Sequence, residues 1–272
     1  MKAEVLTVRM AGGLGNQLFQ FAAGKSCEPR LLVLDTSRLN GTNRNFAISP
    51  LLHKINFEIS EPGMRAKLFA KRIHESKEFT WQSIKLSNRR PNILSGYFQH
   101  PQYAESIILD LASMAESSQQ QRVDSRCSCG GEHIAIHIRR GDYLSIPRNR
   151  QMFGVLNNNY FTSAISRFSS DTHFMVFCES DIQNELLMNL SPSLKVSFAE
   201  IELEPFDLLM MMCSFDGIVM SNSSLSWWAA RIGMQLKKEF QVYSPRIWFK
   251  EISDSRNLIL NGWELLEPEW IK

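Results

Sequence analysis

The chain has 272 residues, of which 44% are hydrophobic and 21% are charged, a balance typical of a soluble globular protein and not of a disordered or fibrous one. Lys and Arg number 30 against 28 Asp and Glu, so the formal net charge is only +2. This excludes a general attraction to nucleic acid, and any bound anion must be held by a local cluster of donors. The length allows two domains, each with a substantial core.

Cysteines and the N-terminus suggest a reducing compartment. The five cysteines are odd in number and show no paired spacing, so we expect free thiols. Cys127 and Cys129, with His133 nearby, resemble half of a zinc site, but no second pair of ligands follows and a structural zinc site needs four. The N-terminus lacks the apolar run of a signal peptide, and no segment has about 18 consecutive apolar residues. We therefore expect a cytoplasmic protein, with peripheral association at the inner face of a membrane left open.

The first part of the chain begins as a βαβ unit. Residues 4–10 have the pattern of a strand, residues 11–17 form a glycine-rich turn, a helix starts at residue 18, and residues 30–37 are typical of a second strand. Residues 53–95 are ambiguous. Residues 114–131 are polar and small, as in a linker, so we predict an N-terminal domain over residues 1–120 and a C-terminal domain over residues 121–272. A last helix that packs back on the N-terminal domain is left open.

The second part continues the alternation. We expect strands over residues 133–138, 173–178, 195–198, 217–220 and 240–243, and helices over residues 160–168, 182–190, 206–212 and 225–236. Alternating strands and helices favour parallel sheets covered by helices, so the predicted class is α/β, with two Rossmann-like domains facing across a cleft. In such sheets ligands bind at the carboxyl ends of the strands.

A charged motif stands at one of these strand ends. The stretch I-A-I-H-I-R-R-G-D-Y runs from a buried strand into Arg139, Arg140 and Asp142. Guanidinium groups suit bidentate contacts with phosphate. A structural ion pair between Arg139 and Asp142 is the alternative. An R-G-D adhesion motif is disfavoured because such a motif needs an exposed extracellular loop.

A serine-rich motif follows a second strand end. Ser221, Asn222, Ser223 and Ser224 separate the strand over residues 217–220 from the helix that begins near residue 225. A helix N-terminus is a ready phosphate site, although the serines would also serve as simple caps. Together with two arginines at another strand end, they favour a phosphate or diphosphate ligand.

Two nucleotide motifs are incomplete. G-L-G-N-Q-L has Leu18 where the third glycine of a dinucleotide fingerprint belongs, and F-Q-F-A-A-G-K-S has Phe19 where a P-loop begins with glycine. A dehydrogenase or P-loop enzyme is therefore disfavoured. The glycines still allow a tight turn beside Asn16 and Gln17, suited to the wall of a cleft.

Four motifs together resemble the bacterial alpha-1,2-fucosyltransferases (galactoside 2-alpha-L-fucosyltransferases). In chain order they are G-G-L-G-N-Q-L-F-Q-F-A (12–22), L-S-G-Y-F-Q (94–99), H-I-R-R-G-D-Y (137–143) and M-S-N-S-S-L-S-W-W-A-A (220–230). The resemblance implies a GT-B-like fold, with the N-terminal domain (residues 1–120) on the acceptor side. It implies that the C-terminal domain (residues 121–272) provides most of the GDP-fucose site. It also implies an inverting transfer of L-fucose to the 2-hydroxyl of a terminal galactose without a metal ion or other cofactor.

The resemblance also implies roles for particular residues. Arg139 would hold the diphosphate, Arg140 and His137 would support it, and Asn16 and Gln17 would close over the donor from the other domain. The serine motif would surround the same diphosphate with Asn222, Ser223, Ser224 and Ser226. The family's paired acid after the middle strand is replaced by F-C-E-S-D, so the roles of Glu179 and Asp181 stay open. The fold of residues 24–31 is also open, because the segment after Ala23 is short for the first helix of the family.

The chemistry agrees with these residues. Breaking a sugar–phosphate bond develops negative charge on the leaving diphosphate, so fixed positive donors there should supply most of the catalysis. Asp142 is either the base for the acceptor hydroxyl or an orienter of Arg139. The partners expected are GDP-fucose and a galactose-terminated oligosaccharide or glycolipid. The alternatives are another fucosyl linkage and a non-catalytic nucleotide-sugar-binding protein; the acceptor beyond its first sugar cannot be inferred from loops 54–90 and 145–156.

Overall fold

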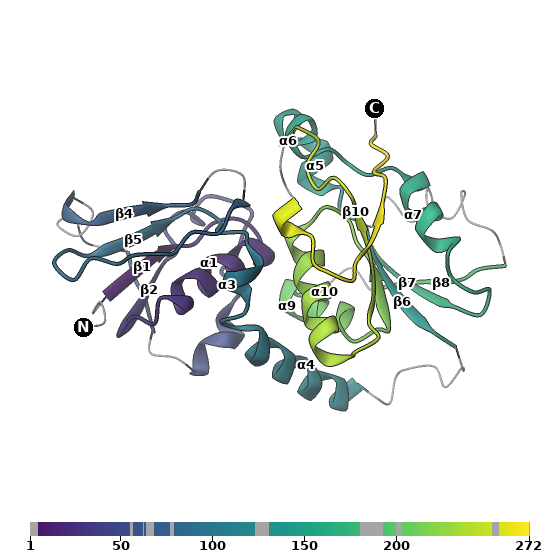
Figure 1. Ribbon diagram of the computed structural model, residues 1–272, viewed down its shortest axis with the longest axis horizontal. Coiled ribbons are helices and arrows are strands. Elements are labelled where there is room, and N and C mark those ends of the chain that lie inside the picture. The colour runs from purple at the N-terminus through teal and green to yellow at the C-terminus, as the bar shows by residue number, and fades with distance from the viewer. Residues whose placement is uncertain are drawn as a thin grey trace. The chain divides into compact units, whose positions relative to one another are not determined.

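The computed structural model describes residues 5–54, 57–61, 63, 68–76, 79–122, 131–179, 193–199, 203–251 and 256–271. The chain divides into two compact units, Met1–Leu111 and Ala112–Lys272 (Figure 1). Each unit is a parallel sheet with helices, so the predicted α/β class is confirmed. No helix within the described ranges is long and apolar enough to cross a membrane.

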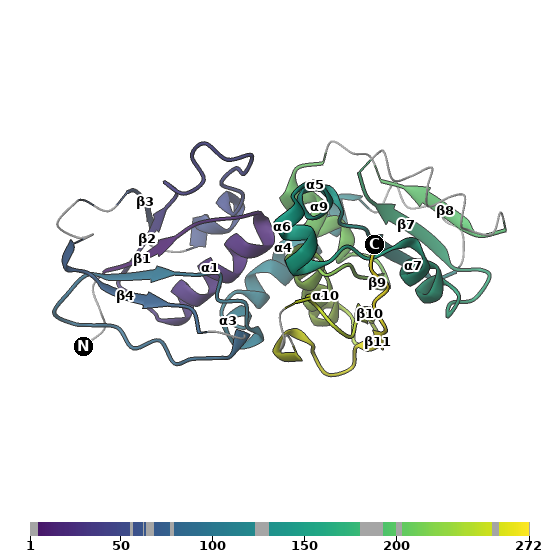
Figure 2. The same ribbon diagram turned by 90° about the horizontal axis from the view of Figure 1, so that it is seen from above.

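The first unit is built on a five-stranded parallel sheet in the order β3-β2-β1-β5-β4. Helix α1 connects β1 to β2 and lies on one face of the sheet (Figure 2). Its Gly24 lies against Val8 of β1. The helix ends at Ser26, and a short turn leads to β2, which answers the open question about residues 24–31. The elements are β1 (Val5–Arg9), α1 (Leu14–Ser26), β2 (Leu31–Asp35), the 3-10 helix η1 (Ser49–Lys54), β3 (Phe57–Ile59), β4 (Lys71–His74), β5 (Asn92–Ser95), α3 (Pro101–Ala104) and α4 (Ile108–Arg122).

The second unit is built on a six-stranded parallel sheet in the order β11-β10-β9-β6-β7-β8. Helix α7 lies on one face, and α9 and α10 lie on the other (Figures 1 and 2). The elements are β6 (His133–His137), α5 (Gly141–Ser145), α6 (Pro147–Phe153), α7 (Asn158–Ile165), β7 (His173–Phe177), β8 (Lys195–Phe198), α9 (Pro205–Met212), β9 (Gly217–Val219), α10 (Ser224–Leu236), β10 (Gln241–Pro245), the 3-10 helix η5 (Arg256–Leu258) and β11 (Glu264–Leu266).

Strand β6 occupies the central position that determines the site. It pairs with β9 on one side and β7 on the other, both parallel. The segments that follow β9 and β7 therefore lie on either side of the segment that follows β6. This topology brings the serine motif, the R-R-G-D motif and Glu179 to one edge of the second sheet.

Some expectations need correction. Helix α4 continues to Arg122, so the first half of the predicted linker is helical, and the predicted boundary at 120/121 falls near the end of this helix. Residues 145–156, expected as a loop, include the end of α5 and all of α6. The described residues after α10 contain no further α-helix; β11 there pairs with β10. The predicted helix at 182–190, with Asp181, Cys127 and Cys129, lies outside the described residues. The cleft between domains stays a prediction.

Candidate active site

Alternation along β6 sorts its side chains between two faces. Ile134, Ile136 and Ile138 belong to a buried cluster with Tyr160 of α7. His137 has the opposite orientation and contacts Ser226 of α10. A strand presents successive side chains to opposite faces, so the polar motif begins where the α10 side of the sheet meets its carboxyl edge.

Arg139 is held by two carboxylates. Its guanidinium donates a hydrogen bond to Asp142, and its Nη1 lies 3.9 Å from Oε1 of Glu179, the residue that follows β7 and Cys178. Its Cζ lies 6.0 Å from the centroid of the Tyr143 ring. The Arg139 side chain keeps 27% of its surface exposed, so the guanidinium is positioned by the protein and still open to a ligand.

A glycine permits this arrangement. Gly141 opens helix α5 with a φ of 22°, in the left-handed region that disfavours other residues. A Cβ atom there would lie 2.9 Å from Oε1 of Glu179 and 3.7 Å from Cζ of Arg139. The positive φ therefore favours glycine at this position of R-R-G-D, and a Cβ atom would in addition displace the carboxylate of Glu179 from beside Arg139.

Arg140, the second arginine of the R-R-G-D motif, is buried. Its Nη2 donates a 2.6 Å hydrogen bond to Oδ1 of Asn158 at the start of α7. A buried charge needs such a partner, and the bond fastens the end of β6 to α7. The structure thus gives Arg140 a bracing position, and its role at the diphosphate stays a prediction.

His137 and Ser226 form the link between β6 and α10. The Nδ1 atom of His137 lies 2.5 Å from Oγ of Ser226, and both residues are buried. Burial, with a smaller contribution from the positive charge of Arg139, lowers the pKa of His137 to about 3. The ring is therefore neutral near pH 7.

Two residues of the serine motif, Asn222 and Ser223, make hydrogen bonds to the backbone. Ser223 is the N-cap of α10, and its Oγ accepts a hydrogen bond from the Leu225 amide, so the capping alternative is realised there. Asn222 is fully buried and its Nδ2 donates to the carbonyls of Phe153 and Gly154, at 3.0 and 3.3 Å. The Nδ2 atom of Asn222 therefore ties the end of α6 to the site, while its Oδ1 is buried without a hydrogen-bond partner within the described residues, and contact with the diphosphate stays a prediction. Ser224, in the first turn of α10, is only partly buried.

The glycine-rich turn of the first unit forms a second polar group at a strand end. Oδ1 of Asn16 accepts a 2.7 Å hydrogen bond from Gln99, which follows β5. Gly12 has a φ of 76°, and a Cβ atom there would lie 2.6 Å from Nδ2 of Asn16. The turn thus depends on this glycine to accommodate the Asn16 side chain.

Gln17 differs from its expected role. Its Nε2 donates to the carbonyls of Gly12 and Asn45, and its Oε1 accepts from the Ala47 amide. The residue is fully buried. Both ends of the amide hold backbone segments together, so the structure gives Gln17 a positioning function instead of direct contact with a donor.

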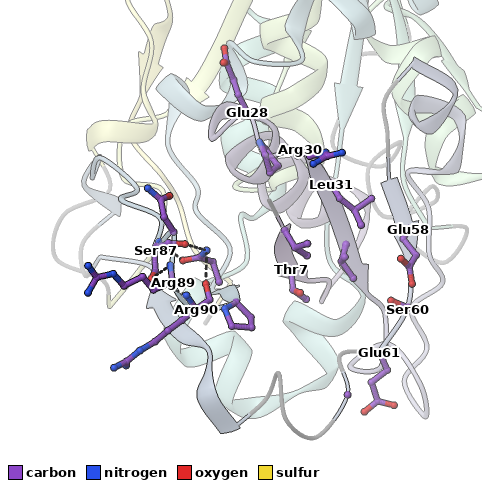
Figure 3. Close-up of a pocket in the computed structure, with 17 residues that line it drawn as sticks. Thr7, Glu28, Arg30, Leu31, Glu58, Ser60, Glu61, Ser87, Arg89 and Arg90 are labelled. Carbon is purple, nitrogen blue, oxygen red and sulfur yellow. Dashed lines mark hydrogen bonds between the residues drawn. The ribbon is translucent and has the colours of Figure 1, made fainter. Parts of the chain in front are cut away.

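A hollow of about 1330 Å³ lies elsewhere, on the first unit (Figure 3). It is lined by the starts of β1, β2 and β5 and by side chains that include Thr7, Glu58 and Arg90. None of the predicted site residues lines it. Within the described ranges, no group of three or more His, Cys, Asp or Glu side chains could hold a metal ion, while Asp181 lies outside these ranges.

Several contributors to the site were not predicted. Asn158 and the carbonyls of Phe153 and Gly154 brace Arg140 and Asn222, and Glu179 pairs with Arg139. The run N-N-N-Y at 157–160 does carry a signal, since Asn before an apolar helix is a common N-cap, and the Asn157 side chain accepts from the Tyr160 amide. No local pattern pairs these residues with the R-R-G-D motif.

Comparisons with known proteins find a matching family and several relatives. The model of glycosyl transferase family 11 matches residues 2–245. The O-antigen biosynthesis glycosyltransferase WbnK of Escherichia coli is 25% identical over 300 residues, 93% of this chain and 98% of the relative. An alpha-1,2-colitosyltransferase of Escherichia coli is 24% identical over 311 residues, 99% of each chain. Among solved structures, the Escherichia coli ADP-heptose lps heptosyltransferase II aligns with a TM-score of 0.49 and 10% identity, over 97% of this chain and 90% of that chain.

Proposed function

The chain belongs to glycosyl transferase family 11, and from this premise we propose that it transfers L-fucose from GDP-fucose to the 2-hydroxyl of a terminal galactose. The product is an α-1,2-linked glycan, and the names of the two relatives favour a place in O-antigen biosynthesis and a 1,2 linkage. The galactose-terminated acceptor is an oligosaccharide or a glycolipid, and a glycolipid would bring the enzyme to the membrane surface.

One observation carries the proposal. Arg139 stands at the carboxyl edge of a parallel sheet, partly exposed, with the neutral His137 and the first turn of α10 beside the same strand end. Parallel sheets of this kind bind ligands at this edge, and a guanidinium with nearby N–H donors suits a diphosphate. This supports binding of a nucleotide sugar by the second unit.

The residues suit the departure of GDP. Cleavage of the fucosyl–phosphate bond leaves negative charge on the diphosphate, and donors fixed in advance stabilise it without reorganisation. Asp142 and Glu179 fix the Arg139 side chain in the protein. Arg139 then acts on the leaving group, while Arg140 and Asn222 hold the surrounding backbone.

A second donor sugar follows from one relative. The alpha-1,2-colitosyltransferase shares the 1,2 linkage of the proposal and 24% identity with this chain. Colitose transferred from its nucleotide-activated form is therefore the second candidate. Another linkage and a purely binding function are the remaining alternatives.

The test is incubation of the purified protein with GDP-fucose and a panel of galactose-terminated disaccharides. We expect release of GDP that depends on the acceptor, with NMR of the product assigning the new bond to the 2-position. A matched 2-deoxygalactoside acceptor should give no product. GDP release no faster than the donor's slow hydrolysis would contradict an enzyme, and a product from the 2-deoxy acceptor would contradict the linkage. Activity only with nucleotide-activated colitose would favour the second candidate.

A further inference from the structure

The contact between His137 and Ser226 indicates which ring nitrogen of His137 bears the hydrogen. A neutral imidazole has one nitrogen that donates and one that accepts, and a hydroxyl has a single hydrogen to donate. Two arrangements therefore fit the 2.5 Å contact between Nδ1 and Oγ. Either Ser226 donates to Nδ1 and the ring hydrogen is on Nε2, or Nδ1 donates to Ser226 and Nε2 is a bare acceptor.

Burial distinguishes the two arrangements. Ser226 has no exposed surface, and its contact with His137 is its only side-chain hydrogen bond within the described ranges. If Nδ1 donated, the hydroxyl hydrogen of Ser226 would be buried without an acceptor, which is a costly state. If Ser226 donates, its hydrogen is satisfied. The arrangement in which Ser226 donates to Nδ1 is therefore favoured, and it places the ring hydrogen on Nε2.

The position of the ring gives this hydrogen a use. His137 is the last residue of β6, and Arg139 follows two residues later, close enough for its charge to influence the ring. Nδ1 is occupied by Ser226, which leaves Nε2 as the nitrogen for a ligand. A bare acceptor there would repel a phosphate oxygen, whereas an N–H group would donate to it.

We infer that Ser226 is a positioning residue that fixes His137 in the Nε2–H tautomer, so that the neutral ring donates a hydrogen bond to the diphosphate of the nucleotide-sugar donor. The diphosphate ligand rests on the proposed function, whereas the tautomer rests on the contact with Ser226 and on the burial of that residue. Ser226 then acts through His137 and does not touch the donor. This differs from the expectation that Ser226 lies directly around the diphosphate.

The first experiment assigns the tautomer. Long-range proton–nitrogen NMR of the protein labelled at histidine should show a hydrogen-bearing Nε2 and a bare Nδ1 for His137, and the assignment is made by loss of the signal in His137→Gln. Ser226→Ala should lower the Nε2–H population, and Ser226→Thr should restore it because the hydroxyl returns. Ser223→Ala is the matched control, because it removes a hydroxyl from the same helix start without touching His137. A wild-type ring with its hydrogen on Nδ1 overturns the inference, as does an unchanged tautomer in Ser226→Ala.

The second experiment measures the effect on the anion, with GDP as the probe. A hydrogen bond to a charged group is worth about 10- to 100-fold in affinity, so GDP should bind Ser226→Ala weaker by that order. Ser226→Thr should recover most of the loss if thermal unfolding shows that the variant folds. Unchanged GDP affinity in a Ser226→Ala protein that has lost the Nε2–H form overturns the role of the ring. Failure of GDP to bind the wild-type protein instead contradicts the proposed function, while the tautomer assignment stands.

Discussion

The guanidinium of Arg139 is joined to the carboxylate of Asp142 across the first turn after β6. The two side chains are 27% and 32% exposed, so the pair lies at the surface of the site and not in the core. At such exposure the ion pair contributes little to stability. Its value lies in orientation, because it fixes where the guanidinium points before a ligand arrives.

Arg139→Lys tests the importance of that orientation. Lysine keeps the charge and loses the planar pair of donors, so turnover should fall on the order of 100- to 1,000-fold, further than the affinity for GDP-fucose. Steady-state kinetics and direct binding of GDP measure the two effects. The matched variant is Arg140→Lys, which breaks the buried bond to Asn158 and should lower the melting temperature, whereas Arg139→Lys should leave it nearly unchanged. Turnover above about a tenth of wild type in Arg139→Lys would direct attention to Arg140, since a key donor is worth ~100-fold.

Asp142→Asn separates the two roles left open for this carboxylate. The contact with Arg139 is what an orienter requires, so we expect GDP affinity and turnover to fall together when the charge is removed. Calorimetry with GDP and initial rates with the acceptor measure both. Glu179→Gln is the control, because Glu179 is farther from Arg139, at 3.9 Å, and its loss should have a smaller effect. Nearly abolished turnover with normal GDP affinity would instead identify Asp142 as the base.

Chelators test the proposed mode of charge neutralisation. Arg139 and N–H donors meet the diphosphate charge in this proposal, so activity should persist in excess EDTA. The measurement is GDP release with and without chelator at fixed donor and acceptor. Loss of activity in EDTA with recovery on addition of Mn²⁺ or Mg²⁺ would refute the expectation and make Glu179 and Asp181 candidate ligands.

The sequence predicted those features that have a local cause. The strand β6 is visible in the alternation of Ile134, Ile136 and Ile138, and the start of α10 is visible in its serine cap. Parallel strands also bring their carboxyl ends to one edge, so the meeting of the arginine and serine motifs could be expected. These predictions needed only periodicity, capping and topology.

The missed features depend on tertiary contacts. Gln17 and Asn222 are polar residues in ligand-like motifs, yet their amides bond to the backbone of Asn45 and Phe153, far along the chain. The sequence of a motif is the same whether its polar side chain binds a ligand or a backbone carbonyl. The partner of Arg140 is Asn158, whose position depends on how α7 packs on the sheet. Such pairings cannot be deduced from local pattern.

The buried His137 makes stability depend on pH. Its pKa is about 6.5 in an unfolded chain and is lowered to about 3 in the fold, chiefly by burial. Between these values the unfolded chain binds a proton that the folded protein does not, so the free energy of unfolding falls as the pH falls below about 6.5. Above about pH 6.5 the ring is neutral in both the folded and the unfolded state, so this loss of stability is absent. Each pKa unit corresponds to about 1.4 kcal/mol. Protonation of this residue in the unfolded chain should therefore lower the free energy of unfolding by a few kcal/mol as the pH falls from about 6.5 to about 3.

His137→Gln isolates this effect because glutamine does not titrate. Urea unfolding of both proteins at about pH 7.5, 6.5 and 5.5 gives two stability profiles, in which carboxylates and other histidines contribute equally. We expect the wild-type profile to fall more steeply below about pH 6.5, by roughly 1 kcal/mol per pH unit relative to the variant. NMR of the folded wild-type protein should find the His137 ring unchanged over the same range. Parallel profiles, or a His137 that titrates near pH 6 in the folded protein, would contradict a neutral buried ring at the end of β6.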